Sequence, residues 1–363
     1  MLRPRTLLLT AAIFLLAHAI LWTLVVNLEP SRHPFNVPTM FMYWDSAHYN
    51  SLVVRGYFTY VLWAFYPLYP LLLRGFAFLT GLYSRPEIAG LIFSTLLFCA
   101  FCLLQARTLN SAGRLHYIRP QTLWGWLFFL FSPGSWVFHS HHTESLFLLL
   151  SLGALVASRK GRWKTAALLA GLCALTKNQG AVLAVAVAID GALQRKGWRD
   201  RALIFAGSGL ISFLLFACFP IYQYVEVGDA LAFVHAQAAW GGVHSFGSYL
   251  ATVWWGNPWQ PGGLHSILHH TFFYLMTISA VGLLIKREFA LSFYVFVSLW
   301  ITPMLGHLEN TFRYTSVLFP GLFFLGDHLL SRLPKPLRLA LLAGLIFLNL
   351  VYARRYALGE WAY

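Results

Sequence analysis

The sequence predicts an all-α, polytopic integral membrane protein. Of its residues, 58% are hydrophobic and only 10% are charged, whereas roughly a quarter of the residues in a soluble domain are charged. Long apolar runs recur along the chain, and a helix needs roughly 20 such residues to cross the bilayer core. These runs do not alternate as the strands of a membrane barrel do. We therefore expect one integral membrane domain over residues 1–363, with about eleven transmembrane helices and a range of roughly nine to thirteen.

The first apolar run, residues 7–26, continues past a triplet that resembles a signal-peptidase site, so we expect a retained first helix. Residues 27–86 contain several prolines and short aromatic pieces. They are expected to form a first external loop with short juxtamembrane helices. A second large external loop is expected at residues 223–263. The other membrane helices are expected at residues 87–104, 122–138, 143–158, 163–176, 180–194, 202–222, 264–285, 289–305, 314–330 and 338–353.

The basic residues cluster in alternate short loops. Eighteen of the 26 Lys and Arg residues fall on one side of the expected helices, and an excess of these residues marks the cytoplasmic side. The N-terminus is then cytoplasmic, and the net charge of +14 reflects membrane orientation rather than nucleic-acid binding. The short cytoplasmic loops favour a bacterial inner (plasma) membrane. The four cysteines lie in apolar segments without zinc or disulfide spacing.

Asp45 is the candidate catalytic group. Eight of the twelve acidic residues lie on the external side, so chemistry is expected there. Asp45 is one of these acids, it directly follows Trp44, and it lies just beyond the first apolar segment. The alternative is that Asp45 only caps a short helix by accepting a backbone N–H. We take Trp44, His48 and Tyr66, all in the first external loop, as candidate substrate-binding residues, although Tyr66 lies in an aromatic piece that packing alone would explain.

The segment His139-Ser140-His141-His142-Thr143-Glu144 lies on the same external side. Three histidines and an acid could hold zinc, but no second set of ligands accompanies them. We favour a polar loop that hydrogen-bonds a sugar. His142 and Glu144 are therefore candidate substrate-binding residues, although the helix dipole alone would favour an acid at the position of Glu144.

Lys177 and Arg313 are external cations beside helix ends. An arginine offers a planar fork for phosphate oxygens, but either side chain could also reach lipid headgroups by snorkelling. The turn that contains Lys177, Asn178 and Gln179 could dip into the membrane, and its residues are candidate substrate-binding groups.

A short surface helix is expected in the segment from residue 228 to 237. Asp229 and Gln237 lie at its two ends and are further candidate substrate-binding residues.

These motifs together resemble the PIG-V family, the GPI mannosyltransferase II group and its bacterial relatives, within the GT-C superfamily of membrane glycosyltransferases. The likeness covers most of the chain, and the short motifs follow the order that the family shows. In this sequence they are Tyr43-Trp44-Asp45, Tyr66-Pro67-Leu68-Tyr69-Pro70, Ser132-Pro133, Thr143-Glu144-Ser145-Leu146-Phe147, Ala174 to Gly180, and Gly228-Asp229 through Phe233 and Gln237.

The resemblance implies a GT-C-like fold and inverting transfer of a sugar, with mannose expected, from a polyprenyl or dolichyl phosphate donor. The acceptor would be a membrane lipid or glycan at the external face. It also implies that Asp45 is the general base and that Glu144 and Gln237 line the site. The chain has Lys177-Asn178-Gln179-Gly180 where the family tends to have Arg-Ser-Asn-Gly, which keeps a cation but loses the fork, and the family pattern does not lead us to expect the triple-histidine loop.

No metal cofactor is expected. The external side has no Asp-x-Asp cluster, and Lys177 or Arg313 could supply the positive charge that a departing phosphate requires.

Two other classes of protein remain open. A lipid-linked-sugar flippase or another transporter usually places ionisable groups near the midplane, often in repeated halves, whereas the unusual charges here lie at external loop ends and no halves match. A non-catalytic membrane subunit would be favoured if the external acids proved dispensable.

Overall fold

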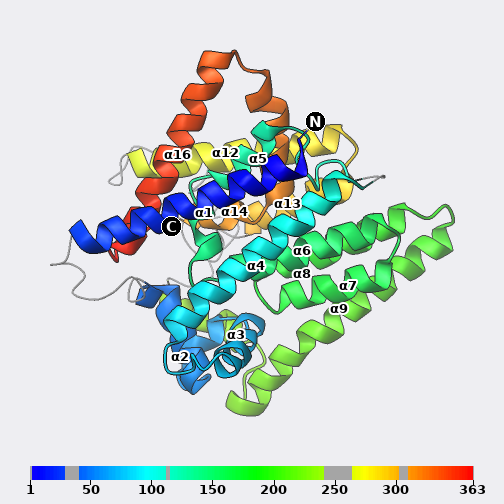
Figure 1. Cartoon of the computed structure of the whole chain (residues 1–363). Helices are drawn as coiled ribbons and strands as arrows, with labels where there is room; N and C mark the ends of the chain where they lie inside the picture. Colours follow the sequence, from blue (N-terminus) through cyan, green and yellow to red (C-terminus); the bar gives the residue numbers. More distant parts are fainter. Residues whose placement is uncertain (1, 29–40, 112–114, 241–263, 302–309, 363) are drawn as a thin grey trace. The chain divides into compact units, whose positions relative to one another are not determined.

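The computed structural model describes residues 2–28, 41–111, 115–240, 264–301 and 310–362. Over these residues the chain is helical and forms no β-strand, which confirms the predicted all-α class (Figure 1). Five of the helices in this described part are long and apolar enough to cross a membrane. They are α1 (Pro4–Leu28), α4 (Pro86–Leu109), α9 (Trp198–Val227), α12 (Leu264–Ile285) and α16 (Lys335–Ala357).

These five helices indicate a multi-pass membrane protein. On α9, large apolar side chains such as Leu210, Phe213 and Ile221 are more than half exposed. Such a surface would be unfavourable in water but suits contact with lipid tails. The other apolar helices are shorter: α3 (Leu68–Leu79), α7 (Trp163–Ala174), α8 (Gln179–Leu193) and α13 (Phe289–Ile301).

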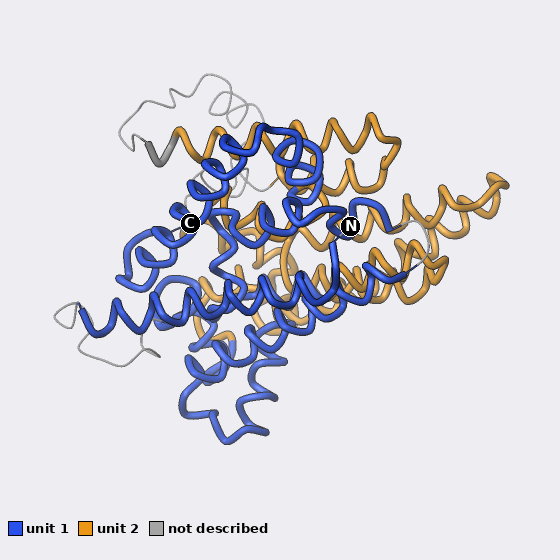
Figure 2. The backbone as a smooth tube through the Cα atoms, turned by 45° about the horizontal axis from the view of Figure 1, so that its top comes forward, with its two compact units in different colours: residues 1–56, 68–149, 322–363 blue, residues 57–67, 150–321 orange. Residues whose placement is uncertain are grey.

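The chain divides into two compact units (Figure 2). Unit 1 contains residues 1–56, 68–149 and 322–363, and unit 2 contains residues 57–67 and 150–321. The chain passes from unit 1 to unit 2 twice, after residue 56 and within α6 (Glu144–Arg159), and it returns to unit 1 after residues 67 and 321. The two units are described one at a time below.

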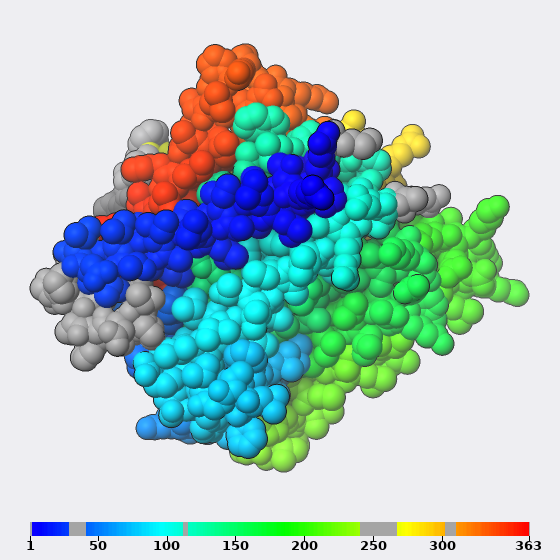
Figure 3. All heavy atoms as spheres, viewed as in Figure 1, coloured from blue at the N-terminus to red at the C-terminus, as the bar shows by residue number. Residues whose placement is uncertain are grey.

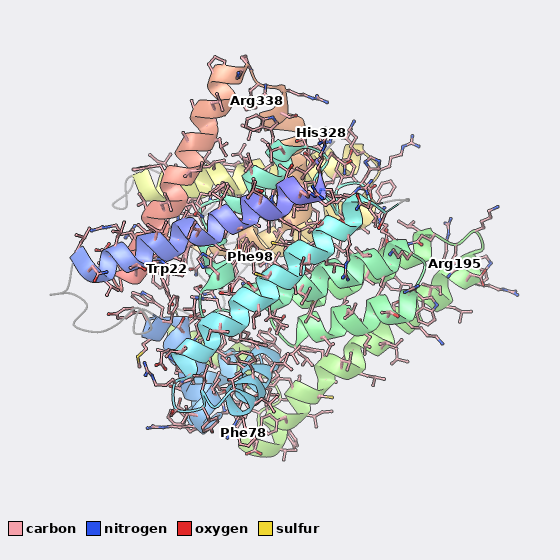
Figure 4. The ribbon with its side chains drawn as sticks, viewed as in Figure 1. Trp22, Phe78, Phe98, Arg195, His328 and Arg338 are labelled. Carbon is pink, nitrogen blue, oxygen red and sulfur yellow. The ribbon has the colours of Figure 1, made fainter. Side chains whose placement is uncertain are left out.

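In unit 1, α1 packs against α4 and α16. Figure 3 shows α1, in dark blue, lying along α4, in cyan. The rings of Phe14 on α1 and Phe98 on α4 have centroids 5.8 Å apart, and the indole N–H of Trp22 donates to the carbonyl of Ala353 on α16 at 3.4 Å. Figure 4 labels Trp22 and Phe98. Aromatic packing and one long-range hydrogen bond therefore join these three helices.

Two of the expected continuous helices are broken, so these two predictions were wrong. Over residues 122–138, α5 (Leu123–Leu130) ends early, and the 3-10 helix η3 (Ser135–His139) follows it. Pro133 lies between them, and proline has no backbone N–H to continue a helix.

Over residues 314–330 the chain forms α14 (Thr311–Ser316), α15 (Phe319–Phe324) and the π-helical turn η7 (Leu325–Leu329). Pro320 lies in the first turn of α15, where its missing N–H is tolerated but prevents continuation from α14.

Unit 2 contains a packed group of α7, α8 and α9. At one end of this group the Arg159 guanidinium pairs with two carboxylates, those of Asp190 on α8 at 3.1 Å and Glu288 before α13 at 2.5 Å. The Ser158 hydroxyl also donates to Asp190. Arg195 by contrast is exposed where α8 leads into α9 (Figure 4). These largely buried ion pairs join α6, α8 and the start of α13.

Short helices are present in both expected external loops. The first loop holds α2 (Asp45–Arg55), the 3-10 helix η2 (Tyr60–Ala64) and α3, and the second holds α10 (Ala232–His235) and the 3-10 helix η4 (Ala236–Trp240). In unit 2 the η2, α10 and η4 segments pack together with α9 around the buried residues Trp63, Phe219, Ala232 and Ala236. Residues 29–40 and 241–263 of these loops, and the end of the helix expected at 289–305, lie outside the described residues.

Candidate functional site

Asp45 is the first residue of α2 and is half-buried. It therefore lies one position inside the helix rather than at the N-cap, which Trp44 occupies. The backbone of Trp44 has φ 52° and ψ −132°, a conformation that normally requires glycine at the first central position of a turn. The turn is closed by a hydrogen bond from Ser46 N to the Tyr43 carbonyl at 3.1 Å. A carboxylate at a helix N-terminus is also favoured by the partial positive charge there.

His48 lies one turn further along α2 and is half-buried. Burial lowers the pKa of His48, and the opposing attraction to the Asp45 carboxylate raises it. The two side chains are therefore near enough to influence each other. In unit 1 this pair is the part of the predicted site that combines an acid, an imidazole and partial access to solvent.

The three histidines of the His139–Glu144 segment are buried, each in different surroundings. His139 contacts the rings of His18 and Trp22 on α1. Burial and the neighbouring His18 lower the pKa of His139. Because its ring lies among α1 side chains, His139 belongs to the helix packing of unit 1.

His141 packs against Tyr49 and Tyr69. His142 contacts the rings of Trp136 and Tyr356, and its Nδ1 lies 2.7 Å from the Ser140 hydroxyl. Across the described ranges, no group of three His, Cys, Asp or Glu residues could hold a metal ion. The imidazoles of this segment are thus engaged in contacts within the protein.

Glu144 is the first residue of α6 and is fully buried. The Thr143 hydroxyl donates to its carboxylate at 3.4 Å. The carbonyl of the neighbouring His142 accepts a hydrogen bond from Ser94 on α4 at 3.1 Å. A buried carboxylate is costly in a membrane protein and points to a functional role.

In unit 2 both predicted cations lie at the short helix α14. Arg313 is on this helix, and Lys177 packs against its Tyr314. Lys177 and Arg313 are each only 7% exposed. The Lys177 ammonium lies 5.0 Å from the centre of the Tyr314 ring, and the Gln179 amide donates to the Tyr314 carbonyl at 3.0 Å. A side chain that snorkels to lipid headgroups keeps its charge in water, so the burial of both cations does not fit that interpretation.

The turn that carries Lys177 is tightly constrained. The Asn178 side chain caps α8 by accepting from the Gln179 N–H at 2.9 Å. Gly180 lies so close to the end of α7 that an added Cβ would be 2.1 Å from the carbonyl carbon of Cys173. No other residue fits at this position, which explains the glycine that ends the motif.

Tyr66 belongs to the same unit and contacts the rings of Phe219 and Phe233. Burial raises the pKa of Tyr66, and the nearby Tyr314 phenol adds to the effect. The aromatic piece that contains Tyr66 therefore reaches the neighbourhood of the two cations.

Asp229 is the centre of a hydrogen-bonded group that the sequence did not reveal. Its Oδ2 accepts from the Tyr60 hydroxyl and from Nδ1 of His235, each at 2.7 Å, and its Oδ1 accepts from Leu231 N at 2.9 Å. The bonds from His235 and Tyr60 lower the pKa of Asp229. Gln237, two residues beyond His235 on η4, is half-buried. The sequence did not point to His235, because it lies six residues after Asp229 across an irregular turn. That spacing matches neither the helix period nor the strand period.

The predicted site residues thus form two groups, one in each unit. Unit 1 holds Trp44, Asp45, His48, His142 and Glu144, and unit 2 holds Tyr66, Lys177, Asn178, Gln179, Asp229, Gln237 and Arg313. Comparison with protein-family models, with curated proteins and with solved structures found no match to this chain.

Proposed function

We propose that the protein is an inverting glycosyltransferase that uses a polyprenyl- or dolichyl-phosphate sugar, with mannose the expected sugar. It would act at the external face of a bacterial inner membrane, in a GT-C-like fold of about eleven transmembrane helices. The observation that carries the proposal is the half-buried Asp45 carboxylate next to the strained backbone of Trp44. Backbone conformations of this kind persist only where the surroundings enforce them, and they cluster at active sites.

The proposed reaction needs one base. Asp45 accepts the proton of an acceptor hydroxyl as that oxygen attacks C1 of the donor sugar. The bond from C1 to the phosphate oxygen breaks, the polyprenyl phosphate departs with the bonding electrons, and the configuration at C1 inverts. The acceptor is a membrane lipid or a glycan.

Two cationic side chains are proposed to bind the donor phosphate. Lys177 and Arg313 are buried cations, and positive charge stabilises a phosphate as its bond to the sugar breaks. The guanidinium of Arg313 can bind two phosphate oxygens at once. With these cations present, the reaction is expected to need no metal ion.

The test is an assay of sugar transfer by the purified protein. The donor is a radiolabelled polyprenyl-phosphate mannose, and the acceptor is a total membrane lipid extract. Replacing Asp45 by Asn should reduce transfer by roughly 10²–10⁴-fold, the usual contribution of a general base. Asp200→Asn is the matched control, because Asp200 is exposed at the start of α9 and should leave transfer unchanged.

Four outcomes would contradict the proposal. Near-normal turnover of the Asp45→Asn variant would exclude this residue as the base. Activity that is lost with EDTA and restored by a divalent ion would contradict the metal-free reaction. Movement of the labelled lipid across a vesicle membrane without transfer would identify a flippase, and neither movement nor transfer would identify a non-catalytic subunit.

A further inference from the structure

The end of the chain contacts the turn at residues 43–46. Helix α16 ends in a Schellman motif, in which Gly359 adopts a left-handed conformation with φ +71°. Gly359 N donates to the Tyr356 carbonyl and Glu360 N donates to the Arg355 carbonyl, both at 2.9 Å. This motif satisfies the last carbonyls of the helix and sets the direction in which the chain continues.

Two contacts hold the side of the turn that precedes Asp45. Gly359 lies against the ring of Tyr43, since a Cβ added to this glycine would be 3.0 Å from Cε1 of Tyr43. Trp361 meets Trp44 edge to face, with ring centroids 5.0 Å apart and an interplanar angle of 88°. Edge-to-face pairs are favourable beyond the area they bury, because the positive edge of one ring meets the negative face of the other.

A hydrogen-bonded contact holds the side of the turn that follows Asp45. The buried Ser46 hydroxyl donates to the His141 carbonyl at 2.9 Å and accepts from the Tyr356 hydroxyl at 2.7 Å. Tyr356 is fully buried and packs against Trp136, with ring centroids 4.5 Å apart. It is therefore a rigid anchor for Ser46.

These contacts involve the residues on both sides of Asp45. A tryptophan at φ 52° is strained, and such a conformation persists only when its surroundings enforce it. We propose that the C-terminal segment from Tyr356 to Trp361 positions Asp45 by holding the turn at residues 43–46 in its strained conformation. This inference rests on the proposed function of Asp45.

The experiment measures two quantities on the full-length protein in detergent. The first is amide hydrogen exchange at Ser46 and Ala47, which reports how firmly the turn is held whether or not the protein is active. The second is the transfer of mannose from a short-chain polyprenyl-phosphate mannose to the membrane lipid extract. The variants are Trp361→Ala, which removes one contact, and Tyr356→Phe, which removes only a hydroxyl.

In both variants, exchange at Ser46 and Ala47 should become about tenfold faster. The kcat should fall by about tenfold, and KM for the donor should stay within about twofold, because a misplaced base affects the chemical step rather than donor binding. Trp361→Phe should restore both quantities. The matched control is Trp198→Ala, which removes a tryptophan that is 74% exposed and should change neither.

Unchanged exchange in both variants would overturn the inference. So would faster exchange with unchanged kcat, because the segment would then hold the turn without positioning the base. If the unaltered protein transfers no sugar, the proposed function fails, and the exchange rates alone decide whether the C-terminal segment holds the turn.

Discussion

The imidazole ring of His141 lies directly against the backbone of Gly90: a Cβ added to Gly90 would be 2.4 Å from both Cγ and Cδ2 of His141. Gly90 is on α4, and His141 lies just before α6. The same imidazole is flanked by Tyr49 and Tyr69, whose ring centroids are 5.9 Å and 5.8 Å from its own. The ring has little room to move aside, so this contact sets the spacing between α4 and the histidine segment.

Replacing Gly90 by Ala should destabilise unit 1 by about 1–3 kcal/mol, because overpacking displaces neighbouring atoms. Gly344→Ala is the matched control on α16, where an added Cβ meets open space; there alanine should be neutral or stabilise by up to about 1 kcal/mol. The thermal-unfolding midpoint in detergent measures both changes. Equal midpoints for the two variants would show that the histidine segment can shift.

The stability of unit 1 should fall in acid because His141 is buried in its neutral form. Burial, aided by the neighbouring His142, lowers the pKa of His141 to about 3, whereas an unfolded histidine has a pKa of about 6.5. The contribution of neutral His141 to the free energy of unfolding is therefore complete above pH 6.5. It is lost as the pH falls toward 3, because over this range the unfolded chain binds a proton that the folded protein does not. The loss should be roughly 1 kcal/mol per pH unit.

Unfolding midpoints measured between pH 7 and pH 4 would show this dependence. The His141→Asn variant cannot take up the proton. Its unfolding midpoint should therefore change less steeply with pH, whatever its absolute stability. His116→Gln is the control, because His116 is exposed in unit 1. A slope unchanged by His141→Asn would assign the acid sensitivity to other groups.

Replacing Arg159 by Met should destabilise unit 2 by about 2–4 kcal/mol, because it leaves the carboxylates of Asp190 and Glu288 in a largely buried site without their cation. Arg195→Met, at an exposed position, should change the free energy of unfolding by less than about 0.5 kcal/mol. Chemical denaturation in detergent compares the two. If both variants lose the same stability, the ion pairs do not hold these helices together.

Most helices could be predicted from the sequence because apolar runs bounded by charged residues determine where they start and stop. For α1, α7, α8 and α12 the expected and observed ends agree within a few residues. The prediction failed over residues 122–138 and 314–330 because mean hydropathy does not register a proline that interrupts hydrogen bonding within an apolar run. The count of eleven transmembrane helices stays a prediction.

The candidate site was less accessible to sequence reasoning. Asp45 could be singled out because acids are rare in this chain, and Lys177 because it follows a short apolar helix. The contact of Lys177 and Gln179 with Tyr314 joins residues about 135 positions apart, and no local pattern encodes it. The C-terminal segment was overlooked for the same reason, since its partners lie more than 300 residues earlier.

The ion pairs of Arg159 also bear on how the protein is made. Glu288 follows Arg159 by 129 positions, so a ribosome completes α6 long before it makes this second carboxylate. If Arg159 is cytoplasmic, as the distribution of Lys and Arg predicts, we expect its guanidinium to act during that interval as a full positive charge that helps orient the new helix in the membrane. Its charge is compensated only when Asp190 and Glu288 arrive with the later helices, so we expect one side chain first to help direct insertion and afterwards to join these helices.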